Sequence, residues 1–246
     1  MGGIPGRGRG LRAPVFVGGA KQVLYEGAGR HHGGMTELDA VQRLVGHVRV
    51  TLGGGPFSAP GGWSHMGAVI CDASFQARRK YESTVRPRIE RLQEAWPDAV
   101  TVRGFRDRIA AEDLAVAMDF NSPRRVATAH GIADLLAANG VDTREDLRTW
   151  LDDRSHRGDL RAVKGVGPKT VDYIGNLVGR SQVAVDVHLR AFAADAGVPG
   201  LKYEQLRAAY EAAAAVLGQE PGGLEHAVWR FTSRTARGRG GAVGGL

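Results

Sequence analysis

Hydrophobic residues recur at intervals of three and four along most of the chain, which is the spacing of an amphipathic helix. An early example is the set Leu38, Val41, Leu44, Val45 and Val48. No stretch shows the sustained two-residue alternation that is typical of a half-buried strand. The pattern therefore predicts an all-α fold with about ten helices.

Several predicted helix ends carry residues that suit them. Thr36 precedes the first periodic segment, and Ser122 precedes another that opens with Pro123, a residue favoured in the first helical turn. Gly140 marks the end of that second segment. Further along, Pro87 predicts a helix start near its own position.

Both ends of the chain are rich in glycine and show no sustained period. Residues 1–34 and 236–246 are therefore predicted to be flexible tails, and residues 35–235 a helical domain. No apolar run approaches the roughly 20 residues that a membrane helix needs. The first residues also lack the pattern of a secretory signal. We expect a cytoplasmic protein without a membrane partner.

The net charge of +7 gives little information about the predicted domain. The first 34 residues carry five basic residues and one acidic residue, and the stretch from Arg234 onward adds three arginines, which together account for the whole excess. A nucleic-acid partner must therefore be argued from a local patch. The only cysteine, Cys71, excludes an intrachain disulfide and a four-cysteine metal or cluster site. His65, His130 and His188 have no metal-ligand spacing, so no metal is expected.

The segment "VKGVGPKTV" predicts a tight hairpin between two helices. Gly165 and Gly167 allow a sharp turn and a close approach of the backbone to a partner, and Pro168 fits the start of the second helix. Val166, between the glycines, is expected to point back and hold the two helices together. Free amides at such a helix start suit a phosphate. The pattern favours a DNA-backbone grip, although an ordinary helix–helix turn is the alternative.

Lys169 and Asp186 are the candidates for chemistry. Lys169 follows the hairpin turn, where a lysine either contacts phosphate or acts as a nucleophile. Asp186 lies 17 residues later, after one helix-length segment, with only Val183, Ala184, Val185 and Val187 around it. Its carboxylate is therefore expected in a partly desolvated place. A helix N-cap is the alternative for Asp186, and the two roles are compatible.

These motifs together resemble a known superfamily. "VKGVGPKTV" followed by "VDVH" is similar to the motifs of the helix-hairpin-helix DNA glycosylases related to endonuclease III, which carry "LPGVGxKTA" and then "VDTH" or "VDVH". Upstream, "GAVICDASFQA" is similar to the family's early helix, which ends in a glutamine near the DNA, here Gln76. "DFNSPRRVATAHGIADLL" is similar to the family's "YNSKAxxI" helix. The resemblance runs from about Trp63 to Gly197.

The resemblance implies two helical subdomains with an active-site cleft between them. The central one would span about 63–180, and the second would combine 35–62 with 181–235. It also implies a monomer that binds double-stranded DNA containing a damaged base and associates with the nucleoid. DNA contacts would come from Lys164, Gly165, Val166, Gly167, Thr170 and Gln76.

The implied reaction is excision of a flipped-out, oxidised base without a metal or organic cofactor. Lys169 would attack the sugar C1′ and form a Schiff base, which also permits strand cleavage, and Asp186 would assist it. Gln76 would fill the gap that the flipped base leaves, unless it is an ordinary buried polar residue. Two alternatives stay open, a glycosylase for alkylated bases without strand cleavage and a non-catalytic DNA-binding repair protein.

The chain departs from that superfamily in two respects. Many relatives hold an iron–sulfur cluster with four cysteines near the C-terminus, and a chain with one cysteine cannot. The final helices around Trp229 and Phe231 must then be held by packing. The loop before Asp186 is also about one residue shorter than in the common pattern. Basic residues near the hairpin are expected to contact phosphates or to line a solvated helix face: Arg154, Arg157, Arg161, Lys164 and Lys169.

Overall fold

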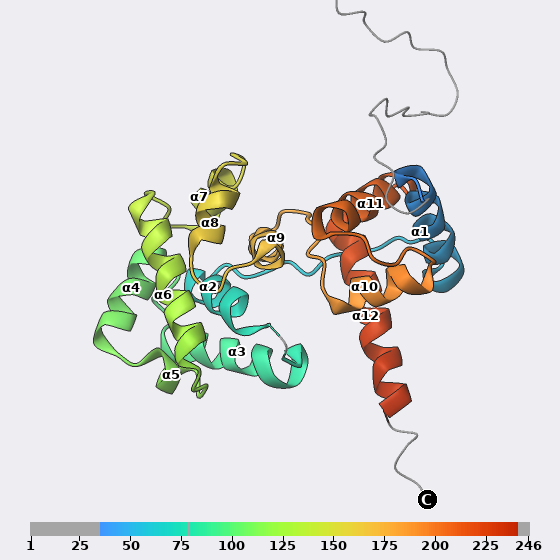
Figure 1. The fold of residues 1–246 in the computed structure, drawn as a ribbon. Helices are drawn as coiled ribbons and strands as arrows, with labels where there is room; N and C mark the ends of the chain where they lie inside the picture. Colours follow the sequence, from blue (N-terminus) through green and yellow to red (C-terminus); the bar gives the residue numbers. More distant parts are fainter. Residues whose placement is uncertain (1–34, 78, 241–246) are drawn as a thin grey trace, which may run out of the picture.

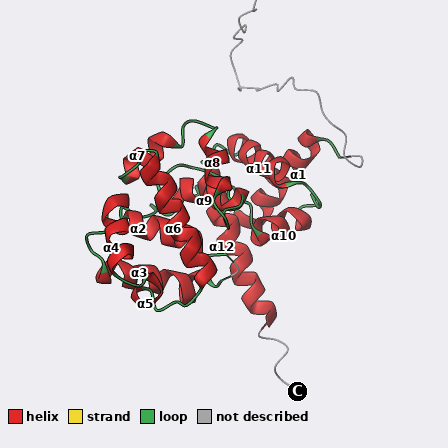
Figure 2. Cartoon of the chain, turned by 60° about the vertical axis from the view of Figure 1, so that its left-hand side comes forward, coloured by secondary structure: helices red, strands yellow, loops and turns green. Residues whose placement is uncertain are grey.

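The computed structural model describes residues 35–77 and 79–240, and this part of the chain contains helices and no strands (Figures 1 and 2). The prediction of an all-α fold is confirmed for these residues. The helices are α1 (Glu37–Leu52), α2 (Met66–Phe75), the π-helix η1 (Tyr81–Val85), α3 (Arg86–Ala95), α4 (Val102–Ala111), α5 (Leu114–Ala117), α6 (Pro123–Ala138), α7 (Arg144–Trp150), α8 (His156–Ala162), α9 (Pro168–Leu177), α10 (Val187–Asp195), α11 (Tyr203–Val216) and α12 (Pro221–Gly240).

Most residues predicted to mark helix ends do so, whereas Ser122 lies at the N-cap of α6 without a capping hydrogen bond from its side chain. Thr36 caps α1 in a capping box, in which its hydroxyl accepts from the amide of Asp39 and the Asp39 carboxylate accepts from its amide. Pro123 opens α6, and Gly140 follows the end of that helix with a positive φ of 69°. α3 begins at Arg86, beside Pro87, and continues directly from η1.

The predicted tails lie largely outside the described residues. Nothing is described for residues 1–34 or 241–246. α12, however, continues to Gly240, so this helix extends into the segment that the sequence assigned to the second tail.

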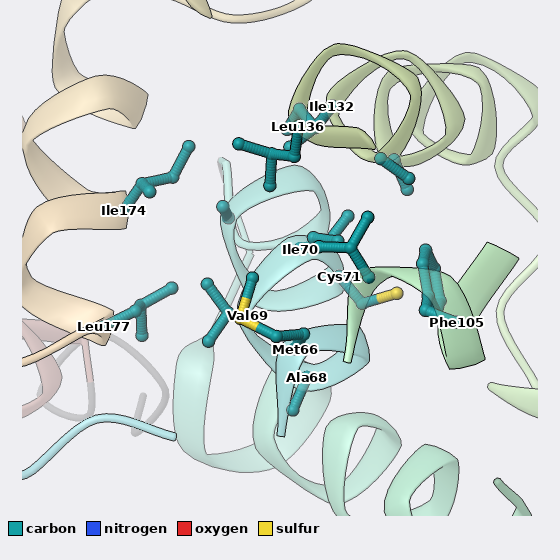
Figure 3. Packing of buried hydrophobic residues seen from close by; sticks show 14 of the residues in the cluster. Met66, Ala68, Val69, Ile70, Cys71, Phe105, Ile132, Leu136, Ile174 and Leu177 are labelled. Carbon is teal, nitrogen blue, oxygen red and sulfur yellow. The ribbon is translucent and has the colours of Figure 1, made fainter. Parts of the chain in front are cut away.

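One hydrophobic core is built from a continuous part of the chain, between Met66 and Val178, which we call the first lobe. α2 lies at its centre and packs against α3, α4, α6 and α9. All ten residues of α2 are buried, which fits its nearly all-apolar sequence. Figure 3 shows α2 side chains, including Val69 and Ile70, facing Ile132 and Leu136 of α6 and Ile174 of α9.

A second core combines α1 with α10, α11 and α12, and we call this part the second lobe. α1 packs against α11, and α10 against α12. Both figures show these four helices grouped together, with the first lobe beside them (Figures 1 and 2). The chain therefore leaves the second lobe after α1, builds the first lobe, and returns after α9.

Side-chain contacts join the two lobes. Tyr203 of α11 donates its hydroxyl to the buried carboxylate of Asp172 on α9 at 2.6 Å. Trp229 of α12 meets Tyr81 of η1 edge to face, with ring centroids 6.4 Å apart. α9 thus belongs to the first core and also faces the second lobe, and it carries Lys169.

Candidate active site

The turn between α8 and α9 holds the predicted hairpin. Gly165 has a φ of 97°, which L side chains rarely adopt. A Cβ at Gly165 would lie 2.4 Å from Oγ1 of Thr128 on α6, and that hydroxyl donates to the carbonyl of Lys164 at 2.9 Å. Thr128 therefore holds the turn against α6, and only glycine leaves room for this contact.

The other hairpin residues differ in exposure. Val166 is buried in the first core, while Lys164 and Gly165 are exposed and Thr170 is half-buried. Gly167 caps α9, and a Cβ added there would meet no heavy atom within 4 Å. The backbone at Gly167 is thus open on the side where the first amides of α9 lack intrahelical acceptors.

Lys169 is the second residue of α9 and is half-buried. Its Nζ donates a hydrogen bond to Oε1 of Gln76, the residue that ends α2. The same Nζ lies 4.6 Å from the centre of the Tyr173 ring, in the geometry of a cation–π contact. The structure thus brings together Lys169 and Gln76, two predicted site residues to which the sequence analysis assigned separate roles.

Asp186 caps α10 at the start of the second lobe. Its Oδ1 accepts from the amides of His188 at 2.8 Å and Leu189 at 3.0 Å, and the residue is half-buried. The N-cap interpretation is therefore correct. The negative charge of Asp186 raises the pKa of Lys169, although no described hydrogen bond or ion pair joins the two side chains. No described carboxylate forms an ion pair with Lys169.

Burial lowers the pKa of the Lys169 amine, because removal of water disfavours the ammonium form. Three carboxylates oppose this effect, in decreasing order Asp186, Glu225 and Asp72. A lysine whose pKa is lowered in this way holds a larger fraction of neutral, nucleophilic amine near neutral pH.

Glu225 is a member of this group that the sequence analysis missed. It lies near the start of α12 and is half-buried, and its carboxylate makes no hydrogen bond with another described residue. Burial raises its pKa to about 8; Asp186 adds to this rise and Lys169 opposes it. Its segment, "GGLEHAVW", looks like an ordinary helix start, so no signal in the sequence separates Glu225 from a surface glutamate.

The sequence analysis also did not predict Asp72 as a site residue, although the sequence around it indicates an unusual environment. It is the only charged residue in the apolar run "GAVICDASF", and it is completely buried. Its carboxylate accepts from Nε1 of Trp63 at 2.8 Å and from the hydroxyls of Tyr81 at 2.9 Å and Tyr173 at 3.1 Å. Burial raises its pKa, while these three hydrogen bonds and the charge of Lys169 lower it.

The basic residues near the hairpin do not act as one group. Arg157 forms a 2.7 Å ion pair with the buried Asp172, so the expectation that it contacts phosphate is replaced by a structural role. Lys169 is turned toward Gln76. Arg154, Arg161 and Lys164 are exposed, and the hypothesis that they contact phosphate remains open.

A further basic surface lies beside Gln76 and was not predicted. Three guanidinium groups surround the Phe120 ring, those of Arg79, Arg88 and Arg125, at 5.5, 5.1 and 6.0 Å from its centre. Arg125 also donates to the carbonyls of Phe75 and Ala77, on either side of Gln76. Arg124 is exposed next to it.

None of these four arginines, which we call the basic surface, forms an ion pair with an acidic residue in the part of the chain that the structure describes. Their charges are therefore not neutralised by neighbouring side chains. Positive groups arranged in this way suit a polyanion.

The described residues contain no group of three or more His, Cys, Asp or Glu side chains that could hold a metal ion. None of the described helices is long and apolar enough to cross a membrane.

The chain matches the model of one protein family. The model of a domain of unknown function, DUF8548, matches residues 61–233, which is more than half of the chain. The chain belongs to the DUF8548 family. The matched range begins before α2 and ends within α12, so the DUF8548 domain contains Asp72, Gln76, Lys169, Asp186 and Glu225. No curated protein and no solved structure matches the chain.

Proposed function

We propose that this protein is a DNA glycosylase with abasic-site lyase activity, which excises a damaged base through Lys169. One observation carries the proposal. Lys169 lies at the start of the hairpin helix, where its half-buried amine contacts Gln76 and the Tyr173 ring; burial lowers the pKa of this amine, and the charge of Asp186 from the other lobe acts on it. A glycine hairpin that grips phosphate would bring DNA to this amine.

The proposed chemistry uses the neutral amine of Lys169. Its lone pair attacks C1′ of a flipped-out nucleotide, the bond from C1′ to the base breaks, and the base leaves with the electron pair and takes up a proton. The nitrogen loses a proton, and the sugar ring opens to a Schiff base as O4′ becomes a hydroxyl. Loss of a proton from C2′ then expels the 3′ phosphate and cuts the strand. Asp186 stabilises the positive charge that develops on the sugar.

Two further features support a DNA substrate. The fold is built from two helical lobes, as expected for the helix-hairpin-helix glycosylases, and carboxylates of the second lobe, Asp186 and Glu225, affect the pKa of Lys169 in the first. The basic surface lies beside Gln76, the hydrogen-bond partner of Lys169. A duplex bound across the hairpin would meet these guanidinium groups with its phosphates. On this proposal the protein works on nucleoid DNA as a monomer.

Borohydride trapping tests the proposal directly. The protein is incubated with duplexes carrying oxidised pyrimidines, 8-oxoguanine, uracil, alkylpurines or an abasic site, and covalent adducts are separated from free DNA. We expect an adduct with the wild type and none with Lys169→Ala. Lys164→Ala is the matched control, because Lys164 is an exposed hairpin lysine, and this variant should bind DNA less tightly and still form the adduct.

The other outcomes identify the alternatives. Base release without an adduct would indicate a glycosylase that does not cut the strand. DNA binding without base release or an adduct would indicate a non-catalytic DNA-binding protein. Asp186→Asn tests the second residue, because asparagine caps a helix about as well as aspartate. If Asp186→Asn releases the base at the full rate, Asp186 has no role in the chemistry.

A further inference from the structure

Asp72 is a completely buried carboxylate in the middle of a hydrophobic helix. Burial of a charged group costs several kcal/mol unless hydrogen bonds compensate it. Three side chains donate hydrogen bonds to the Asp72 carboxylate: Trp63 from the loop before α2, Tyr81 from η1 and Tyr173 from α9. No positively charged side chain bonds to the carboxylate within the described residues, so Asp72 is not half of an ordinary buried ion pair.

The carboxylate is connected to Lys169 by direct contacts. Tyr173 lies one turn after Lys169 on α9; its ring faces the Lys169 Nζ, and its hydroxyl donates to Oδ1 of Asp72. Gln76 lies one turn after Asp72 on α2, and its Oε1 accepts from the same Nζ. The amine is therefore held by two side chains, and Asp72 fixes the orientation of one of them.

We propose that Asp72 is a positioning residue which, through the hydroxyl and ring of Tyr173, holds the Lys169 amine in place for attack on C1′. The proposal rests on the proposed function for the identity of the reaction. A nucleophile must be held close to the reacting atom, and a displacement of about 1 Å can lower a rate by about 100-fold. The ring of Tyr173 supplies a face that attracts the ammonium and limits its movement.

Asp72 also affects the charge state of the amine. The groups that face Lys169 are Asp72 from α2, Asp186 from the start of α10, Glu225 from α12, and the Tyr173 ring on its own helix. Each of the three carboxylates raises the pKa of Lys169 against the effect of burial. Replacement of Asp72 by asparagine should therefore lower the pKa of Lys169, whereas loss of the Tyr173 hydroxyl leaves the carboxylate in place.

Two substitutions separate positioning from folding. Tyr173→Phe keeps the ring and removes its bond to Asp72, and Asp72→Asn keeps the shape and removes the charge. Tyr203→Phe is the matched control, because it removes a tyrosine bond to another fully buried carboxylate, Asp172, which makes no described contact with the Lys169 amine. We expect similar losses of thermal stability in Tyr173→Phe and Tyr203→Phe.

The main readout is the single-turnover rate of adduct formation as a function of pH, with DNA affinity measured separately. Tyr173→Phe and Asp72→Asn should bind DNA like the wild type and react about 10- to 100-fold more slowly. In Asp72→Asn the acid limb of the profile should also move to lower pH. Tyr203→Phe should react at the wild-type rate. Wild-type rates and an unmoved acid limb in folded Tyr173→Phe and Asp72→Asn would overturn the proposal.

A second readout does not require activity. The NMR signal of the Lys169 side chain in isotope-labelled protein, assigned by its loss in Lys169→Ala, gives the pKa of the amine directly. We expect a lower pKa in Asp72→Asn and a changed chemical shift in Tyr173→Phe, where the ring is free to turn. If the wild type forms no adduct, the proposed reaction is wrong; if the signal is the same in all variants, the positioning role of Asp72 is wrong.

Discussion

Gly165→Ala should destabilise the protein by about 2–4 kcal/mol. An alanine at a φ of 97° costs about 1–3 kcal/mol. Its Cβ would also lie 2.4 Å from Oγ1 of Thr128, so the threonine must move and its 2.9 Å hydrogen bond to the Lys164 carbonyl is lost. That loss adds about 1 kcal/mol. For a chain of this size the total corresponds to a melting temperature lowered by about 5–15 °C.

Gly167→Ala is the matched control for Gly165→Ala. Gly167 has an extended backbone with a φ of −108°, and an added Cβ meets nothing within 4 Å. The free energy of unfolding of Gly167→Ala should differ from that of the wild type by less than about 1 kcal/mol. A methyl group on this open side should, however, hinder the approach of a phosphate and weaken binding to an undamaged duplex about fivefold, which corresponds to about 1 kcal/mol.

Urea denaturation and fluorescence anisotropy with an undamaged duplex measure the two effects. A double-mutant cycle with Thr128→Ala sharpens the stability test, because both substitutions remove the same hydrogen bond. The double variant should therefore be less destabilised than the sum of the single variants, by about 1 kcal/mol. Equal stability of Gly165→Ala and Gly167→Ala, or strict additivity in the cycle, would refute the reasoning.

Three further predictions concern stability and DNA binding. Burial raises the pKa of Glu225 from 4.5 to about 8. Between pH 4.5 and about pH 8 the folded protein therefore retains a proton that the unfolded chain releases, so the stability of the wild type should fall as the pH rises through this range. Glu225→Gln should reduce that fall in urea denaturation at several pH values, and an identical pH dependence would contradict it. Arg157→Ala leaves the buried Asp172 carboxylate without its ion-pair partner and should cost about 3 kcal/mol in the same assay, whereas a loss below about 1 kcal/mol would show that the pair is not structural. Arg124→Ala should lower the salt dependence of DNA binding by the equivalent of about one phosphate contact. Arg106 is already paired with a carboxylate, so Arg106→Ala should leave the salt dependence unchanged. Equal effects of the two substitutions would exclude the basic surface as a DNA contact.

Local patterns in the sequence were sufficient for the all-α class, for several helix ends and for the turn between α8 and α9, but the described residues form twelve α-helices and one π-helix where about ten were predicted. Thr36, Pro123 and Gly140 mark helix ends because their own backbone and side-chain preferences decide the local structure. The same holds for the N-cap role of Asp186, which depends on the next three residues alone.

The surroundings of Lys169 depend instead on helices that are distant in the sequence. Gln76 meets Lys169 because α2 packs against α9, and the charge of Glu225 acts on Lys169 because α12 of the second lobe docks beside the first lobe, where Trp229 meets Tyr81. No local sequence pattern indicates that these helices come together around Lys169. Asp72 is an intermediate case, since an acidic residue in an apolar run signals a special environment and its partners become known only from the fold.

The discontinuous construction of the second lobe has a consequence for how the chain folds during synthesis. The first lobe is one continuous segment, so it can form its core as soon as α9 leaves the ribosome. α1 is made earlier, yet its apolar face has no partner until α11 and α12 follow. That face is therefore the part of the nascent protein most exposed to aggregation or to a chaperone. Asp186 and Glu225 are made after the first lobe is complete, so the group of charges around Lys169 is finished only when the last helices dock.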